Sequence, residues 1–481
     1  MSINLAMNAA ISGLGASTRA IEVVSSNVAN AMTEGYATRQ IQLSSSVVGG
    51  TGNGVRVVGV ERQVDPVLNG LMRKAGGAMA GAGAQAGFWT TLEQAIGLPG
   101  DPHGLTGKVA ALESALIASA ARPDQDHLLK AVVDASSDLV RQLNQLEDQV
   151  QSLRHRADVT IARDVADLNQ GLERVAQLNR DIVKLQAAGH SALGLVDERQ
   201  AMIDSLSQIV PIKELQHTDG RIVLYTEGGQ LLLDTKPAVF GFTASPAMDA
   251  TMSLQNGQLN GLTINGRDVS TGPEGPLAGG RLAGNFAVRD RDAPQAQAAL
   301  DAIAMDIITR FEDPAVDPSN APGQPGLFTD LGLPFDPLET QGLAGRISVN
   351  AAVRPDAGGD LWLLRDGLGA AMPGPVGHSA QIQRWIEALQ VPLVGPSGGA
   401  ARSFSDSVGQ SISGLSQARQ AAEDRSGYAT AYQTELKQSA LAMGVDVDAE
   451  MQRLMLIEKA YAANTRVLQI ADEMLRRMLE I

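Results

Sequence analysis

The sequence of 481 residues contains no cysteine. Without cysteine the chain has no disulfides, no thiolate nucleophile, no cysteine-ligated zinc site and no iron–sulfur cluster. Aromatic residues are scarce (8 Phe, 5 Tyr and 3 Trp), which argues against stacking platforms for sugars or bases. Basic residues are outnumbered, with 38 Lys and Arg against 53 Asp and Glu and a net charge of −15. We therefore expect no binding to nucleic acid, which requires clustered Lys and Arg.

Long apolar runs are also missing. No stretch of about 18 apolar residues occurs, so we expect no membrane-spanning helix and no membrane insertion. A Sec-type signal peptide begins with basic residues and continues with an apolar run, whereas here the first basic residue is Arg19, and Asn4 and Asn8 interrupt the apolar positions. The sequence leaves two expectations: a cytoplasmic protein, or export by a route that does not read such a signal.

Motifs that carry catalytic chemistry are sparse. The six histidines stand singly, and none has a second histidine at the i, i+4 spacing of a helical metal pair. The segment Gly395–Gly399 fits the expression GxSxG, but a nucleophile elbow needs a strand before it and a helix after it. We interpret this Pro/Gly-rich segment as a linker. We predict no catalytic residues, no metal site and no cofactor, and we do not expect an enzyme.

The N-terminal segment has a heptad pattern. Apolar or small residues recur at alternating steps of four and three, and the pattern stops at Gly35, a residue that favours the left-handed end of a helix. We predict an N-terminal helix with one packing seam. The residues of this seam are Met7, Ile11, Leu14, Thr18, Ile21, Ser25, Val28 and Met32.

The C-terminal segment has the same spacing and more apolar surface. Its first stripe is Val447, Leu454, Ile457, Tyr461, Leu468, Ala471, Leu475 and Met478. A second stripe beside it is Leu456, Ala460, Ala463, Val467, Ile470, Met474 and Ile481. A solvent-facing helix carries one apolar stripe, so two stripes indicate burial on more than one side. The N-terminal helix accounts for one partner, and we infer that the second stripe contacts neighbouring subunits.

The middle of the chain contains a long helical segment, then a β-rich segment, and then helices again. From Asp124 to Ala188 there is no Pro and only one Gly, and a sustained apolar stripe predicts one very long helix. Between about residues 212 and 285, short β-prone runs are separated by Asn-Gly and Gly-Gly pairs, which predict hairpins. The predicted strands are 221–225, 230–234, 251–254, 257–259 and 262–264, with further strands at 346–350 and 361–364. The other predicted helices are 108–121, 293–311, 379–389 and 404–443.

The predicted fold class is mainly α with an inserted β domain. The N- and C-terminal helices are expected to pair as a coiled coil, beside an elongated helical bundle and a small antiparallel β domain. The expected domains are a terminal coiled-coil domain (1–45 and 440–481), a helical bundle domain (46–211 and 286–439) and a β-rich domain (212–285).

Both ends of the chain also carry recognisable motifs. Ala10–Leu14 (AISGL), Ser26–Asn30 (SNVAN) and Thr33–Tyr36 (TEGY) resemble the N-terminal signature of bacterial flagellar axial proteins, the family of rod, hook and hook-associated proteins. Glu34 stands where that signature usually has Pro. Gly444–Met451, Ala460–Asn464 and Ala471–Leu475 resemble its C-terminal signature. The long helical bundle, with Gly280–Asp290 and Gly345–Asn350, most resembles the first hook–filament junction proteins within that group.

This resemblance implies a structural protein of the flagellum that forms the junction ring between hook and filament through its terminal helices. It implies as partners the hook protein, the second hook–filament junction protein, further copies of this chain, and a cytoplasmic export chaperone on the C-terminal helix. The implied location is extracellular, at the hook–filament junction, after a cytoplasmic stage. The residues expected at the assembly interface are Ile11, Leu14, Ile21, Asn27, Val28, Asn30, Gly35, Tyr36, Met451, Leu454, Ile457, Tyr461, Asn464, Leu468, Ile470 and Leu475.

Other interpretations stay open at this point. The chain could be another axial protein, such as the second junction protein or a filament subunit. It could instead be a surface-binding or hydrolytic protein that acts through the β insert, in which case convergent carboxylates or a ligand pocket are expected within residues 212–290. A cytoplasmic coiled-coil scaffold is the third possibility.

Overall fold

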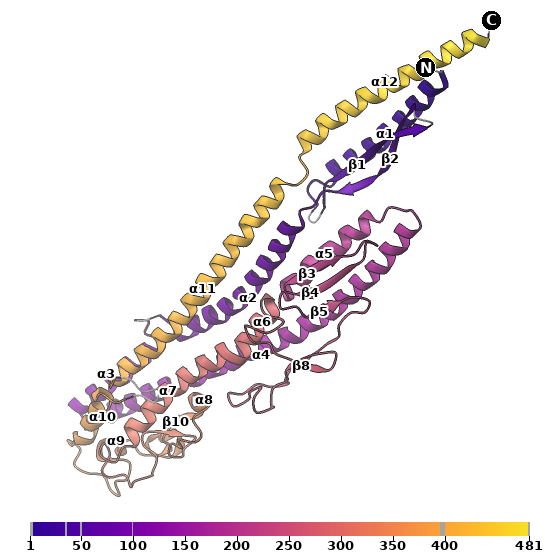
Figure 1. Cartoon of the computed structure of the whole chain (residues 1–481). Helices are drawn as coiled ribbons and strands as arrows, with labels where there is room; N and C mark the ends of the chain where they lie inside the picture. Colours follow the sequence, from indigo (N-terminus) through magenta and orange to yellow (C-terminus); the bar gives the residue numbers. More distant parts are fainter. Residues whose placement is uncertain (1–2, 34–35, 49–50, 99, 395–399, 480–481) are drawn as a thin grey trace.

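The computed structural model describes residues 3–33, 36–48, 51–98, 100–394 and 400–479. The molecule is elongated, and both termini lie at one end (Figure 1). At that end, the first helix, a β-hairpin and the last helix form a narrow unit, here called the arm. The elements of the arm are α1 (Ile3–Ala29), β1 (Arg39–Val48), β2 (Thr51–Arg62) and α12 (Val447–Leu479). The remaining helices and small sheets form a longer unit, here called the body.

Long helices that run beside one another dominate the body (Figure 1). These helices are α2 (Pro66–Ile96), α3 (Leu105–Ala121), α4 (Asp126–Ala187), α5 (Leu193–Ile209), α6 (Gly280–Ala287), α7 (Ala293–Glu312), α10 (Ala380–Gln390) and α11 (Phe404–Ala442), with short turns at α8 (Leu343–Arg346) and α9 (Leu363–Asp366). The main helix pairs in the body are α2 with α11, α2 with α6 and α3 with α4. A π-helical turn, Val288–Asp292, joins α6 to α7.

Local chemistry sets several helix ends. Asp65 caps α2 by accepting hydrogen bonds from the backbone N–H groups of Val67 (2.8 Å) and Leu68 (3.1 Å), and Pro66 occupies the first turn, where a missing N–H costs nothing. Ser403 caps α11 through the N–H of Asp406 at 3.2 Å. The connection between α3 and α4 contains Pro123, which cannot continue a helix. The predicted break at Pro123 and the predicted start of α11 therefore have local causes.

Two hydrophobic cores lie along α4. The first contains buried side chains of α2, α3, the first half of α4, α7, α10 and α11, including Leu112, Leu143 and Trp385. The second contains the later part of α4, α5, α6 and the strands of the insert, including Leu168, Leu206 and Leu262. Because α4 supplies residues to both cores, its 62 residues form the common support of the body.

Within the described residues, the strands form four small antiparallel sheets. The insert contributes β3 (Ile212–Gln216), β4 (Ile222–Thr226), β5 (Leu231–Leu233), β6 (Phe240–Gly241), β7 (Leu262–Ile264) and β8 (Arg267–Val269), which pair in the orders β3-β4-β5 and β6-β7-β8. The pair β9 (Phe328–Asp330) and β10 (Ile347–Val349) lies near α4, and β1 pairs with β2 in the arm. The insert packs its apolar side chains against α4 and α5 in one shared core.

Most sequence-predicted elements are confirmed within one to three residues at their ends. The fold class is also confirmed, because long terminal helices pair with each other and the sheets are small and antiparallel. The hairpin turn predicted at an Asn-Gly pair is present between β7 and β8, where Asn265 and Gly266 have φ values of 51° and 77°. The linker predicted at Gly395–Gly399 lies outside the described residues.

Three strand predictions are wrong, namely 251–254, 257–259 and 361–364. Residues 251–259 form turns, because the side chain of Asn256 takes up the backbone groups that a ladder would need: it accepts from Ser253 N–H at 3.0 Å and donates to the Thr251 carbonyl at 2.8 Å. Residues 361–364 enter a helical turn, in which Arg365 and Asp366 each donate a backbone hydrogen bond to the Trp362 carbonyl at 3.0 Å.

Several elements had no predicted counterpart, among them the hairpin β1–β2, helix α2, helix α5 and the short strands β3, β6 and β9. The sequence of α2 contains many glycines and lacks a clear apolar period. The structure supplies the reason, since a Cβ on Gly81 would lie 2.6 Å from the Gly280 carbonyl, and one on Gly284 would lie 2.5 Å from the Gly81 carbonyl. Helix α2 thus packs on α6 through close backbone contacts at glycines, and it has no need of the stripe of large apolar side chains that marks a packed helix in a sequence.

A half-buried carboxyl group on α4 predicts how stability depends on pH. Burial, reinforced by the nearby Asp148, raises the pKa of Glu147 to about 7. The pKa of Glu147 is lower in the unfolded chain, so the folded state binds the proton more tightly. Proton binding at Glu147 therefore favours the folded state at low pH, and this stabilisation is lost as the pH rises through about 7. We expect Glu147→Gln to raise the melting temperature relative to the unchanged chain at pH 8 and to have little effect at pH 5. Melting curves between pH 5 and 8 test this, and a constant difference across that range would contradict it.

Candidate assembly site

The arm is held together by the packing of α1 against α12 and the hairpin. On α12, the less exposed side chains recur at steps of three and four, so they occupy one helix face. These residues are Leu454, Ile457, Asn464, Leu468, Ala471 and Leu475. On α1, Gly13 lies close against α12, because an added Cβ there would lie 2.6 Å from the Asn464 side chain. The hairpin covers another side of α1, where Ser12 Oγ accepts a hydrogen bond from Val55 N–H at 3.1 Å.

The prediction of which face of α1 forms its packing seam is wrong, because the buried residues lie on a face rotated about the helix axis from the predicted one. The buried residues of α1 are Ala10, Ala16, Ser17, Ala20, Val23, Val24 and Asn27. Of the seam predicted from heptad spacing, Met32 is 98% exposed, Ile11 is 53% exposed, and Thr18 is also exposed. Small residues occupy the buried face because α1 lies between a helix and a hairpin at close range. Small residues contribute little to a hydrophobicity pattern, so the pattern does not identify this face.

The second stripe of α12 lies on the surface of the single chain. Leu456 is 67% exposed, and Ile470 and Met474 are about half exposed, at 48% and 51%. Ala460, Ala463 and Val467 complete this face, and all three are exposed. A continuous apolar face along one exposed helix is the kind of surface that marks a protein–protein contact. Burying one Leu- or Ile-sized side chain contributes about 1.5–3 kcal/mol, so the face can supply a large part of an assembly energy.

A hydrogen-bonded bracket holds the base of the hairpin on α1. Asn27 is fully buried, and its Oδ1 accepts from the Tyr36 hydroxyl (2.9 Å) and from Arg39 N–H (3.0 Å), while its Nδ2 donates to the Arg39 carbonyl (2.8 Å). Ser26 Oγ lies 3.3 Å from the Tyr36 hydroxyl. Residues of the N-terminal motif thus contact one another within one chain. Because Asn27 is buried, its side chain makes these contacts inside the chain.

We expect Asn27→Ala to loosen the hairpin. The change leaves the Arg39 backbone groups and the Tyr36 hydroxyl without their partner, which costs about 1–3 kcal/mol for buried groups. Hydrogen exchange at the Arg39 amide should accelerate by at least tenfold, with little change in the body. Ser25→Ala is the matched control, because Ser25 is exposed on the same helix. Unchanged protection at Arg39 in the Asn27 variant would contradict the bracket.

The residues predicted for the assembly interface fall into three groups. Ile11, Met451, Tyr461 and Ile470 are exposed. Leu14, Ile21, Val28, Asn30, Leu454, Ile457, Asn464, Leu468 and Leu475 are half-buried on α1 and α12 or just beyond α1. Asn27 and the half-buried Tyr36 belong to the bracket. Gly35 lies outside the described residues.

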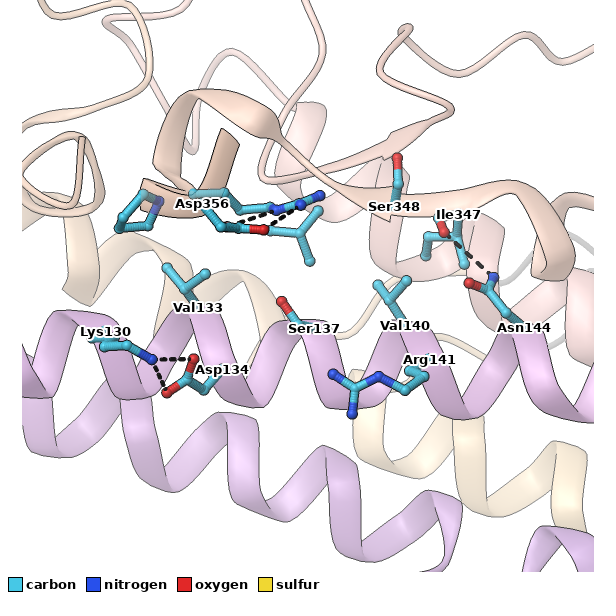
Figure 2. A pocket seen from close by; sticks show the side chains of 13 residues that line it. Lys130, Val133, Asp134, Ser137, Val140, Arg141, Asn144, Ile347, Ser348 and Asp356 are labelled. Atoms are coloured by element: carbon cyan, nitrogen blue, oxygen red, sulfur yellow. Dashed lines mark hydrogen bonds and ion pairs between the residues drawn. The ribbon is translucent and has the colours of Figure 1, made fainter. Parts of the chain in front are cut away.

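A groove in the body has a different character (Figure 2). Its volume is about 550 Å³, and it lies between α4 and the segment from β10 to Asp356. Lys130 Nζ lies 2.7 Å from both carboxylate oxygens of Asp134, and Arg354 Nη2 lies 2.7 Å from Asp356. Asn144 donates to the Ala344 carbonyl at 2.8 Å. These polar groups pair with one another, and the apolar side chains of Val133, Val140, Ile347 and Val349 line much of the rest of the groove.

Among the described residues, no group of three or more His, Cys, Asp or Glu side chains is arranged to hold a metal ion. Within the same ranges, no helix has the length and apolar character needed to cross a membrane.

Comparison with protein-family models gives three matches in chain order. Residues 7–36 match the flagella basal body rod protein family, residues 90–326 match the helical domain of the flagellar hook-associated protein FlgK, and residues 437–481 match the C-terminal region of the flagellar basal body rod proteins FlgEFG. The first match begins within α1 and extends past its end, the central match runs from the end of α2 past α7, and the last match begins within α11 and includes α12.

Curated relatives give the same picture. The flagellar hook-associated protein 1 of Salmonella typhimurium is 24% identical over 360 residues, covering 72% of this chain and 63% of the relative, so this chain spans under two thirds of that protein's length. The protein of the same name from Bacillus subtilis is 20% identical over 508 residues, covering 97% of this chain and 96% of the relative. A solved structure of FlgK from Burkholderia pseudomallei is 21% identical with a TM-score of 0.45, covering 55% of this chain and 46% of that one.

Proposed function

We propose that this chain, which belongs to the flagellar hook-associated protein 1 family, is a structural subunit of the junction between the hook and the filament of a bacterial flagellum. The proposal is that several copies form a ring at this junction and that their arms make the contacts. The family is one of structural flagellar proteins, and we propose that the chain has no catalytic activity of its own.

The observation that carries this proposal is the exposed apolar face of α12. The face runs beside the seam that already pairs α12 with α1, so the arm is folded within one chain and still has an unused apolar side. Exposed Leu, Ile and Met side chains along a helix favour a further helix as the partner. A ring of identical chains supplies such a partner at every contact.

Other partners and the location follow from the same proposal. The hook protein would lie on one side of the ring and the second hook–filament junction protein on the other. Before assembly, a cytoplasmic export chaperone would cover the apolar face of α12, which otherwise promotes association. The mature chain would then lie outside the cell, at the flagellum. Within the ring, the arm would form the inner layer, the helical body a middle layer, and residues 212–285 an outer layer.

Labelling of intact flagella tests the location. Immunogold directed against this chain is expected to mark a single short zone between hook and filament. Deletion of the gene is expected to leave hooks without filaments, and expression of the unchanged chain should restore them. Gold particles along the whole filament would contradict the proposal and indicate a filament subunit, and label confined to the cytoplasm would indicate a scaffold instead.

A further inference from the structure

The arm and the body share little packing surface. The extensive partners of α1, β1, β2 and α12 are one another, and the chain enters and leaves the arm through two short connections, residues 63–65 and 443–446. Neither connection is helical or part of a strand. Two such connections would allow the arm to change its angle to the body unless a specific contact fixes it.

One contact of this kind joins the base of the hairpin to α5. Arg39 Nη2 donates to Asp197 Oδ2 at 2.7 Å, and Arg62 Nε lies 2.8 Å from Asp197 Oδ1. The two arginines come from the arm, whereas Asp197 lies in the first half of α5 in the body. The side chains of all three residues are at most 21% exposed. Each carboxylate oxygen of Asp197 therefore faces a different strand of the arm.

The charge arrangement explains why this carboxylate matters. Arg39 and Arg62 are directly opposite one another in the β1–β2 register. Like charges in directly opposed positions destabilise a strand pair, and a shared carboxylate between them removes that repulsion. Asp197 thus stabilises the open end of the hairpin while it ties the hairpin to α5.

The same arginine is connected to the N-terminal motif. The backbone N–H and C=O of Arg39 are both bonded to Asn27, and its guanidinium lies 4.9 Å from the centre of the Tyr36 ring. Contacts therefore continue from α1 through Asn27 and Arg39 to Asp197. The motif positions the backbone of Arg39, and Arg39 in turn reaches the body.

We propose that Asp197 is a positioning residue, which fixes the angle between the arm and the body by bridging Arg39 and Arg62. Without it, the arm turns about residues 63–65 and 443–446, and its apolar face is no longer presented in one direction. The importance of this angle for ring formation rests on the proposed function, but the angle itself is a property of the single chain.

Distance measurements on the purified full-length chain test the proposal. Because the chain has no cysteine, Thr18→Cys on α1 and Ala166→Cys on α4 give two unique exposed sites for spin labels. Double electron–electron resonance is expected to show one narrow distance distribution. Asp197→Asn is expected to broaden it at least twofold, while Asp197→Glu, which keeps the charge, restores a narrow distribution.

Glu198→Gln is the matched control. Glu198 is the next residue on α5 and pairs with Arg174 of α4, inside the body, at 2.5 Å. The distribution should stay narrow in this variant. An unchanged distribution in Asp197→Asn, equal broadening in Glu198→Gln, or a broad distribution in Asp197→Glu would overturn the proposal. Because the measurement uses the free chain, its result does not depend on whether the chain assembles at a flagellar junction.

Discussion

Replacing Ile470 by Asp is expected to abolish the proposed assembly at the junction while leaving the chain folded. Ile470 lies on the apolar face of α12 and is 48% exposed in the single chain, so a carboxylate there remains solvated before assembly. In a ring the same carboxylate would lie against apolar side chains without a partner, and burying an unpaired charge costs several kcal/mol, on top of the lost apolar contact. Cells carrying this variant should have hooks without filaments and should not swim.

Gln469→Asp is the matched control for this experiment. It introduces the same charge one residue away, at an exposed position outside both apolar stripes. Motility and filament number should stay close to those of the unchanged chain, and the circular dichroism of both purified variants should match it. Normal filaments in the Ile470 variant would contradict the assignment of this face, and a loss of filaments in both variants would show that any added negative charge on α12 is harmful.

The second large effect is expected in the body. Arg289 lies in the π-helical turn and pairs with Asp158 of α4 at 2.8 Å, and both side chains are fully buried. Asp158 also accepts the backbone N–H of Ser245 at 2.6 Å, and Arg289 donates to the Asn260 carbonyl at 3.1 Å. The pair therefore joins α4, the insert and the turn between α6 and α7. Removing one partner of a buried pair leaves an uncompensated charge and costs about 3–5 kcal/mol.

We therefore expect Arg289→Met to lower the free energy of unfolding of the body by about 3–5 kcal/mol. Trp89, Trp362 and Trp385 all lie in the body, so tryptophan fluorescence during urea denaturation reports its unfolding. Arg141→Met is the control, because the side chains of Arg141 and its partner Asp138 on α4 are 63% and 41% exposed, and such a surface pair should contribute less than about 1 kcal/mol. Equal denaturation midpoints for the two variants would contradict the role of the buried pair.

The sequence predicted α4 well because its signals are local. The 62 residues of α4 contain no proline and one glycine, and their apolar residues repeat at helical spacing, so no other structure fits. The turn at Asn265 and Gly266 was equally clear, since both residues tolerate a positive φ. Short segments were less certain: Asn256 could have closed a hairpin, but its amide bonded the adjacent backbone instead.

By itself, the sequence determined the class of the protein and the pairing of its ends. Zero cysteines, few aromatics, two apolar stripes on the last helix and the terminal motifs were sufficient for that. Only the tertiary structure decided which face of α1 is buried, why α2 is rich in glycine, and that Asp197 meets Arg39 and Arg62. The physical reason is distance along the chain, because Arg39 and Asp197 are separated by 158 residues. No periodic pattern encodes a contact between them, and only the packed fold brings them together.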